Sequence, residues 1–243
     1  MDIGQSLSFI RREAGLPNEW RPEVLERQGI PATSIPLTEV PYDHKSWEVL
    51  KRRRLLHMAD RVNIEVVGRY SGRFILPATF VGEVKGYEAK SYSGQFTKCL
   101  YPEWFKTYGE LYTTPDWDWT CDGAILTESI FDAETFGQNS IGFYGSKFTH
   151  GKLTRLLEMR EKGLKNLLWA WDPDAWFSQA RAIIGGTAGL FQNFFIPLPR
   201  YDEAGGKADP NALGRARCLD LLDQAVKVDS EIEVARRSVE MLR

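Results

Sequence analysis

The feature that most constrains this chain is a series of short apolar runs in its second half, each followed within a few residues by acids. The runs read as strands and the stretches between them as helices, which favours a parallel sheet with crossover helices. In such open sheets, binding sites form outside the carboxyl ends of the strands. We therefore expect five acids to meet at one sheet edge: Glu128, Asp132, Asp172, Asp174 and Asp209.

Five carboxylates at one edge repel one another unless a positive charge lies among them. Mg²⁺ is the natural candidate, because it prefers oxygen ligands and is usually held by one or two carboxylates together with substrate phosphates. The sequence therefore predicts metal-assisted phosphate chemistry, with Mg²⁺ or Mn²⁺ as the cofactor.

Asp172 and Asp174 flank Pro173. Proline fixes its own φ and disfavours the helical region for the residue before it, so we expect an extended segment here. Residues two apart in an extended segment point the same way, and both carboxylates could then face one metal. The alternative is a helical role: Asp174, or else Asp172, as N-cap of a helix over residues 176–184, and Asp132 as a charge that favours its own helix dipole.

Charge is distributed unevenly along the 243 residues, although the net charge of −2 gives no overall nucleic-acid signal. Residues 45–106 hold twelve Lys or Arg against six acids, including the run from Lys51 to Arg54. A basic surface beside an acidic metal site suits a polyanionic ligand. The alternative is an ordinary solvated helix face.

The three cysteines and three histidines have no metal-ligand spacing, so the sequence predicts no zinc site. An odd cysteine count without a recognisable signal peptide favours a reducing cytoplasm, that of the host if the chain is viral. No apolar run has the length of a membrane span.

The first half has a different pattern of elements. We expect a helix over residues 5–28, then a basic helix over residues 46–61 with Ser46 as its N-cap. Alternating residues then predict the strands of a small antiparallel meander, over residues 63–70, 73–80 and 83–92.

The acids, spaced E-x-x-x-D, then D-x-D about forty residues later, then D-P, resemble the Toprim domain of primases, topoisomerases and some nucleases. The resemblance runs from about residue 123 to residue 213. It implies that Glu128 ends the first strand of the domain and that Asp132 lies in the following helix. It also makes Asp172 and Asp174 the D-x-D pair and Asp209 the acid of the late motif.

Residues 72–112 resemble the N-terminal half of the catalytic core of DnaG-type primases, from bacteria and phages. The resemblance rests on an Arg before an apolar-Pro strand, a glycine-aromatic pair at Gly86-Tyr87, and the lysine of a late motif. Lys90 replaces the usual Arg of the family, and Lys106 lies near a further basic position of the family. The residues that the resemblance implies for template or triphosphate binding are Arg73, Lys90, Lys98 and Lys106.

Both resemblances imply an α/β fold in three parts. The parts are a smaller mixed α+β primase subdomain over residues 1–118, a Toprim domain with a central parallel sheet flanked by helices over 119–215, and a C-terminal helix over 216–243. The template is expected to cross between the first two parts.

The implied function is that of a DNA primase catalytic core in DNA replication, which makes short RNA primers on single-stranded DNA from ribonucleoside triphosphates. Metals held by Glu128, Asp172 and Asp174 would serve catalysis, and Asp132 and Asp209 would complete the metal shell. Such primases ordinarily carry a zinc module and a helicase-binding region, so we expect a replicative helicase and a separate zinc-bearing protein as partners.

Two other functions stay open. A Toprim nuclease would use the same acids to cleave a phosphodiester bond, and a binding subunit would hold template or helicase without catalysis. Retention of all five acids argues against the binding subunit. Ser129, where most relatives have Gly, and Trp176, where relatives have Gly, argue for it.

Overall fold

The computed structural model of this protein describes residues 30–31, 33–202, 205–206, 208–228, 230, 233 and 236. Within this range nothing is described of four side chains in one helix, those of Pro173, Asp174, Trp176 and Phe177. The helix expected over residues 5–28 and most of the chain after residue 228 lie outside the described residues. No helix that the structure describes is long and apolar enough to cross a membrane.

The chain forms two compact units. Unit 1 comprises Met1–Thr79 and Glu83–Phe105, and unit 2 comprises Phe80–Gly82 and Lys106–Arg243. The units divide after Phe105, and strand β6 (Tyr112–Thr113) pairs with strand β8 (Ser140–Gly142) inside unit 2.

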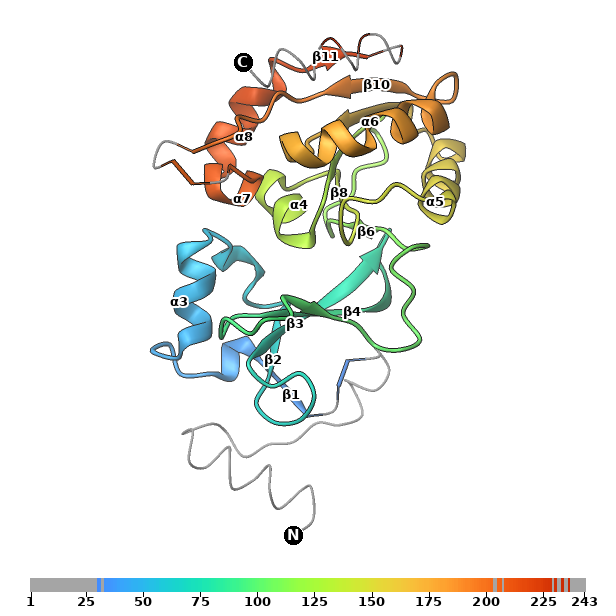
Figure 1. The fold of residues 1–243 in the computed structure, drawn as a ribbon. Helices are drawn as coiled ribbons and strands as arrows, with labels where there is room; N and C mark the ends of the chain where they lie inside the picture. The colour runs from blue at the N-terminus through green and yellow to red at the C-terminus, as the bar shows by residue number, and fades with distance from the viewer. Residues whose placement is uncertain are drawn as a thin grey trace. The chain divides into compact units, whose positions relative to one another are not determined.

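Unit 1 is built on a five-stranded sheet in the order β1-β2-β3-β4-β5 (Figure 1). Its strands are β1 (Ser34–Pro36), β2 (Asn63–Glu65), β3 (Arg73–Phe80), β4 (Glu83–Ser91) and β5 (Cys99–Leu100). The expected meander is confirmed, since β1–β2, β2–β3 and β4–β5 pair antiparallel and the chain reverses between β3 and β4 at Val81-Gly82. Strand β2 is shorter than expected, because Gly68 takes a φ of 92° and turns the chain.

The basic helix of unit 1 is also shorter than expected. Helix α3 spans Lys45–Arg52, and its N-cap is His44, whose ring nitrogen accepts a hydrogen bond from the backbone N–H of Ser46 at 3.3 Å. The prediction of Ser46 as cap was therefore wrong, and the chain leaves the helix where Arg54 takes a φ of 58°. Two short 3-10 helices flank α3: η1 (Leu37–Glu39) and η2 (Leu56–Met58).

Unit 2 contains a six-stranded sheet in the order β11-β10-β9-β7-β8-β6. Its remaining strands are β7 (Gly123–Thr127), β9 (Asn166–Trp169), β10 (Gln192–Phe195) and β11 (Val226–Lys227). The four inner strands are parallel to one another, and the two edge strands β6 and β11 are antiparallel to their neighbours. The predicted α/β class with a central parallel sheet is confirmed.

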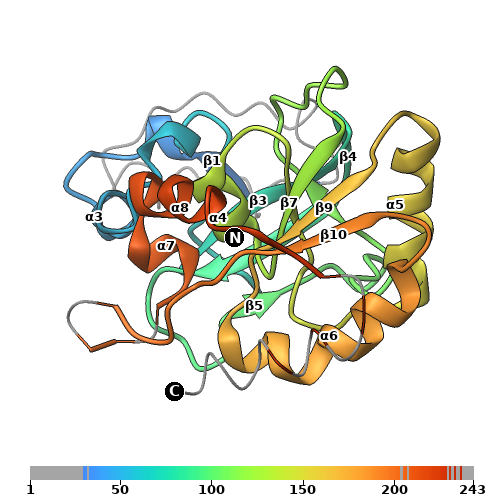
Figure 2. The ribbon, with the colours of Figure 1, turned by 90° about the horizontal axis from the view of Figure 1, so that it is seen from above.

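Helices cover both faces of this sheet, as Figure 2 shows. One face carries α4 (Ile130–Phe136), α7 (Pro210–Leu213) and α8 (Arg215–Leu222). The other face carries α5 (His150–Glu161) and α6 (Pro173–Thr187).

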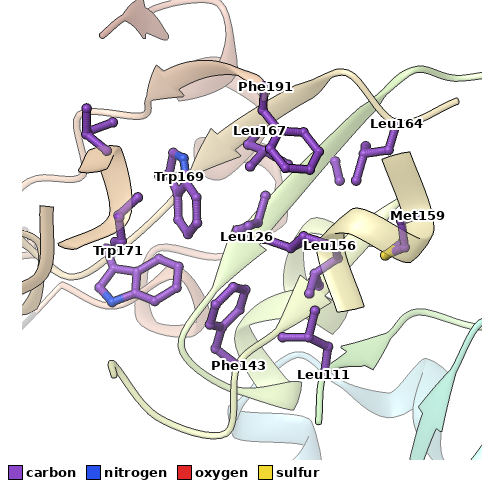
Figure 3. Close-up of a cluster of buried hydrophobic side chains, with 14 of the residues drawn as sticks. Leu111, Leu126, Phe143, Leu156, Met159, Leu164, Leu167, Trp169, Trp171 and Phe191 are labelled. Carbon is purple, nitrogen blue, oxygen red and sulfur yellow. The ribbon is translucent and has the colours of Figure 1, made fainter. Parts of the chain in front are cut away.

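Alternation along the central strands explains the two covered faces. Leu126 and Trp169 belong to the larger buried cluster, drawn in Figure 3, together with residues of α5 and α6. Ile125 and Leu168, one position away on the same strands, pack against the cluster around Phe136 on the opposite face. Burying each large apolar side chain contributes about 1.5–3 kcal/mol, so both faces hold the sheet in place.

The order of the strands defines one special point in unit 2. From β7 the chain moves to β8 on one side, and from β9 it moves to β10 on the other side. The direction of winding therefore reverses between β7 and β9. In open α/β sheets the crevice outside the carboxyl ends of two such strands is the usual binding site.

Candidate functional site

Two of the expected acids lie together at this reversal point. Glu128 directly follows β7, and Asp172 follows β9, which is the parallel neighbour of β7 in the register Leu126 to Trp169. The backbone N–H of Asp172 donates a hydrogen bond to Oε1 of Glu128 at 3.2 Å. The structure thus joins the two strand-end acids directly.

The segment after β9 departs from the expected extended pair. Helix α6 begins at Pro173, so Asp172 is its N-cap, with φ −55° and ψ 140°, and Asp174 lies inside the first turn. Proline does keep Asp172 out of the helical region, but it also favours the first helical position, and here it starts the helix. The extended pair and the alternative of Asp174 as N-cap were therefore wrong, whereas Asp172, the other residue considered as a cap, does lie at the N-cap position.

The start of α6 favours negative charge beside the joined acids. The helix has 15 residues, and the side chain of its N-cap, Asp172, makes no capping hydrogen bond. Unbonded N–H groups and the helix dipole place partial positive charge at this end. The same end can attract the phosphate groups of a ligand.

Asp132 is held differently, within helix α4. Its side chain is 8% exposed, and its Oδ2 accepts a hydrogen bond from Oγ of Ser129 at 2.6 Å. The backbone N–H of Asp132 in turn donates to Oγ of Ser129 at 3.3 Å. Ser129 is therefore the N-cap of α4 and orients the carboxylate of Asp132, a contact that a Gly at this position could not make.

Asp209 caps the short helix α7. Its Oδ1 accepts a hydrogen bond from the backbone N–H of Ala212 at 2.6 Å. Helix α7 contacts α4 through Asn211, whose Nδ2 donates to Oγ1 of Thr135 at 3.2 Å. Asp209 therefore has a capping role that the sequence did not predict.

The charges of Asp132 and Asp209 both affect the buried thiol of Cys218. Burial, together with the nearby charges of Asp132 and Asp209, raises the pKa of the Cys218 thiol to about 12. The five acids thus include one hydrogen-bonded pair, Glu128 with Asp172, and two acids, Asp132 and Asp209, whose charges both act on Cys218.

The donor set at the reversal point fits Mg²⁺. Among the residues that the structure describes, no three His, Cys, Asp or Glu side chains lie close enough together to hold a metal ion by themselves. Mg²⁺ does not need such a cage, because it usually takes one or two carboxylates and completes its shell with waters and substrate phosphates. Glu128 and Asp172 supply two carboxylates, and the side chain of Asp174 lies outside the described set.

Arg73 on β3 is built into the sheet of unit 1. It is 3% exposed, and its Nη1 donates to the backbone carbonyls of Lys98 at 3.2 Å and Ala89 at 3.4 Å. Burial lowers the pKa of its guanidinium. Its Nε has no hydrogen-bond partner among the described residues. These contacts tie β4 and β5 together, and binding of phosphate by Arg73 stays a prediction.

The three other predicted cations differ in exposure. Nζ of Lys90 lies 3.5 Å from Oε1 of the buried Glu88, whose Oε2 also accepts a hydrogen bond from the hydroxyl of Tyr101 at 3.0 Å. Lys98 and Lys106 are exposed. The exposed pair is therefore better placed to reach a large anionic ligand than Lys90.

Lys152 was not singled out from the sequence. It is 2% exposed on α5, and it lies on the same buried stripe as Leu156 and Met159. Lys152, Leu156 and Met159 have the i, i+4, i+7 spacing of one helix face, so the sequence did contain a signal that Lys152 lies on the buried face.

The two sheets and their helices are those of a DnaG-type primase catalytic core, as the sequence resemblance implied. No family model matches the chain, and no curated protein matches it by sequence. Solved structures do match. The zinc-binding and RNA polymerase domains of the Aquifex aeolicus primase match with a TM-score of 0.53 and 17% identity, over 98% of this chain and 64% of that chain.

Two further structures show the same fold. A DnaG catalytic core matches with a TM-score of 0.52 and 18% identity, over 93% of this chain and 75% of that one. A DnaG primase catalytic domain bound to single-stranded DNA matches with a TM-score of 0.51 and 15% identity, over 93% of this chain and 74% of that one. This chain therefore spans less than two thirds of the Aquifex chain and about three quarters of the other two.

Proposed function

We propose that this chain is a primase catalytic core, which makes short RNA primers on single-stranded DNA by metal-dependent nucleotidyl transfer. One observation carries the proposal: Glu128 and Asp172 are joined at the reversal point of a parallel sheet, in a chain with a primase fold. The alternative functions need the same fold but differ in what happens to the phosphate.

Glu128, Asp172 and Asp174 would hold Mg²⁺ or Mn²⁺, and Asp132 and Asp209 would complete the metal shell. When bound, the metal lowers the pKa of the attacking 3′-hydroxyl and neutralises charge on the leaving pyrophosphate. The N-terminal end of α6 would attract the phosphates of the incoming triphosphate. The hydrogen bond from the Asp172 N–H would fix the orientation of the Glu128 carboxylate before substrate binds.

The predicted cations, three of them in unit 1 and Lys106 in unit 2, would hold the nucleic acid or the triphosphate. Lys98 and Lys106 are exposed, and lysines on a rigid framework contact phosphates without reading sequence. Arg73 donates a hydrogen bond to the backbone carbonyl of Lys98, and Lys90 forms an ion pair with Glu88. Their main role would be to hold the strands next to Lys98 in place. The solved DnaG domain bound to single-stranded DNA supports DNA as the template here.

Further partners follow from this function. Priming on a moving replication fork calls for a replicative helicase, and start-site selection calls for a zinc-bearing template-recognition protein. We expect both to raise initiation more than extension, because starting a chain requires two nucleotides to be held at once. A primase of this kind would act in the cytoplasm of its cell or host.

One assay tests the proposal. The full chain is given single-stranded DNA annealed to a short ribo-oligonucleotide, labelled ribonucleoside triphosphates, and Mg²⁺ or Mn²⁺, with a chelator as control. We expect metal-dependent extension of the ribo-oligonucleotide by added ribonucleotides. Cleavage of the DNA without extension would identify a nuclease, and DNA binding with neither reaction would identify a binding subunit.

A further inference from the structure

Lys152 is a buried cation close to the start of α5. Its Nζ donates a hydrogen bond to the backbone carbonyl of Lys147 at 2.8 Å and lies 5.2 Å from the centre of the Phe143 ring. Burial lowers the pKa of its amine to about 8. A desolvated amine is unfavourable for stability compared with an apolar side chain. Its position therefore points to a role other than stability.

Both groups that Lys152 contacts belong to residues 143–149, which run from the end of β8 to α5 and are called the bridging loop here. The backbone N–H of Gly145 donates to the backbone carbonyl of Glu128 at 2.7 Å. Nε1 of Trp171 donates to the carbonyl of Ser146 at 3.3 Å. The bridging loop is thus hydrogen-bonded to Glu128 itself and to the residue before Asp172.

The bridging loop has an unusual backbone. Tyr144 and Gly145 take φ values of 52° and 116°, in the region that L side chains rarely adopt. Such conformations persist where surrounding contacts hold them. Lys152 supplies one such contact, because its hydrogen bond fixes the carbonyl of Lys147 two residues further along.

Ring contacts continue the connection toward the acids. The Phe143 ring packs against Trp171 with centroids 4.9 Å apart and planes at 77°, an edge-to-face arrangement that Figure 3 shows. Trp171 is fully buried, and the next residue is Asp172. Nζ of Lys152, the Phe143 ring, the Trp171 ring and Asp172 therefore form one contiguous series.

We propose that Lys152 is a positioning residue for the Glu128–Asp172 pair: it holds the bridging loop, and the loop holds the two segments that carry these acids. The proposal rests on the proposed function only in giving the pair a metal-binding role. Lys152 itself touches neither substrate nor metal.

The test compares three variants of the full chain. Lys152→Met removes the amine and keeps the length of the side chain, whereas Lys152→Gln keeps a neutral hydrogen-bond donor. Lys165→Met is the matched control, because Lys165 is exposed at the other end of β9 from Asp172. Amide hydrogen exchange is followed in residues 143–149 and 170–172, and Mn²⁺ affinity is measured from the free Mn²⁺ signal in electron paramagnetic resonance.

We expect Lys152→Met to keep or raise the melting temperature, because a buried amine is removed. Exchange should accelerate in residues 143–149 and at Asp172 while β10 stays protected, and Mn²⁺ affinity should fall about tenfold, as for other residues that orient metal ligands. Lys152→Gln should recover part of the affinity, and Lys165→Met should match the wild type.

Coupling to Trp171 gives a second readout. Trp171→Phe removes the N–H donor to the Ser146 carbonyl and keeps an aromatic ring at this position. If both residues act through the bridging loop, the double variant with Lys152→Met should lose clearly less Mn²⁺ affinity than the sum of the single losses. Strict additivity would count against the proposal.

Two results would overturn the proposal: wild-type exchange and Mn²⁺ affinity in Lys152→Met, or a lowered melting temperature with protection lost evenly across unit 2. If Lys152→Met does not fold, Lys152→Gln is compared with the wild type by the same criteria. If the wild type itself neither binds Mn²⁺ nor makes RNA, the proposed function fails, and the exchange data alone decide whether Lys152 holds the loop.

Discussion

The acids of unit 2 and the cations of unit 1 were both expected to serve one anionic substrate, yet the two sets are held in different ways. Glu128 and Asp132 accept hydrogen bonds from an N–H and a hydroxyl, through carboxylate oxygens of the kind that a metal would also contact. Arg73, in contrast, donates to backbone carbonyls inside the sheet.

The difference comes from where each residue lies on its strand. Glu128 and Asp172 follow the ends of strands, where topology alone brings side chains to the sheet edge. Arg73 lies at the start of an eight-residue strand whose residues are mostly buried. A strand end is therefore a safer place from which to predict a site than a position within a sheet.

The largest expected effect tests the acid side of this comparison. Asp172→Asn or Glu128→Gln should lower ribonucleotide incorporation at least about a hundredfold, because each variant would lose one of the proposed metal ligands. The melting temperature should stay level or rise, because like-charge repulsion is relieved. Incorporation and thermal unfolding are measured together, with the exposed Asp220→Asn as control. Near-wild-type synthesis by Asp172→Asn would remove the metal-site assignment.

The next effect tests the cation side. Arg73→Ala should lower the free energy of unfolding by about 1–3 kcal/mol, because the carbonyls of Ala89 and Lys98 lose a charged donor. Denaturant titration measures this decrease. A fully stable Arg73→Ala protein that binds DNA weakly would instead show that Arg73 contacts phosphate.

Lys98→Ala provides the contrast with Arg73, because Lys98 is exposed. Its stability should stay within about 0.5 kcal/mol of the wild type. The slope of log affinity for single-stranded DNA against log salt should become shallower by about 0.7 for each phosphate that the variant no longer neutralises. An unchanged slope would place the template-binding residues elsewhere.

A pH experiment tests whether burial lowers the pKa of Lys152, the buried cation of unit 2. Burial lowers the pKa of Lys152 from 10.5 to about 8, so between these values the unfolded chain binds more protons than the folded one. The free energy of unfolding should therefore rise with pH across this window, relative to Lys152→Met, by about 3 kcal/mol. Contributions from the cysteines and tyrosines cancel in the difference between the two proteins. A constant difference would mean that the Lys152 pKa is not lowered.

The smallest effect separates two roles of Asp209. Asp209→Ala should cost about 1 kcal/mol of stability through loss of the α7 cap, whereas Asp209→Asn keeps the cap and should cost little. If Asp209 also belongs to the metal shell, both variants should lose Mn²⁺ affinity. Full affinity in Asp209→Asn would leave Asp209 with capping alone.

The parallel sheet could be predicted because its strands are short apolar runs with residues buried on both faces, and the acids after them mark the strand ends. Helix starts could not be fixed in the same way. Pro173 suits both an extended segment and a first helical turn, and only the packing of α6 on the sheet decides between them. His44 is an uncommon N-cap, so nothing in its local sequence favoured it over Ser46.

The contacts of Lys152 could not be predicted from the sequence, for a third reason. The spacing of Lys152 with Leu156 and Met159 indicated one helix face, but a lysine near the start of a helix is usually read as solvated. Its partners, Phe143 and Lys147, reach it only through the turn of the bridging loop. Propensity and periodicity carry no information about such a turn, whereas tertiary contacts do.

The edge strands of the unit 2 sheet, β6 and β11, have a consequence for solubility. Each has only two residues and runs antiparallel to its neighbour. Apolar parallel strands such as β7 and β9 would invite pairing with another molecule if they lay at an open edge. Instead, the short antiparallel strands β11 and β6 border the four parallel strands, beside β10 and β8. Two-residue strands offer few backbone groups for an added strand, which protects the sheet from edge-to-edge aggregation.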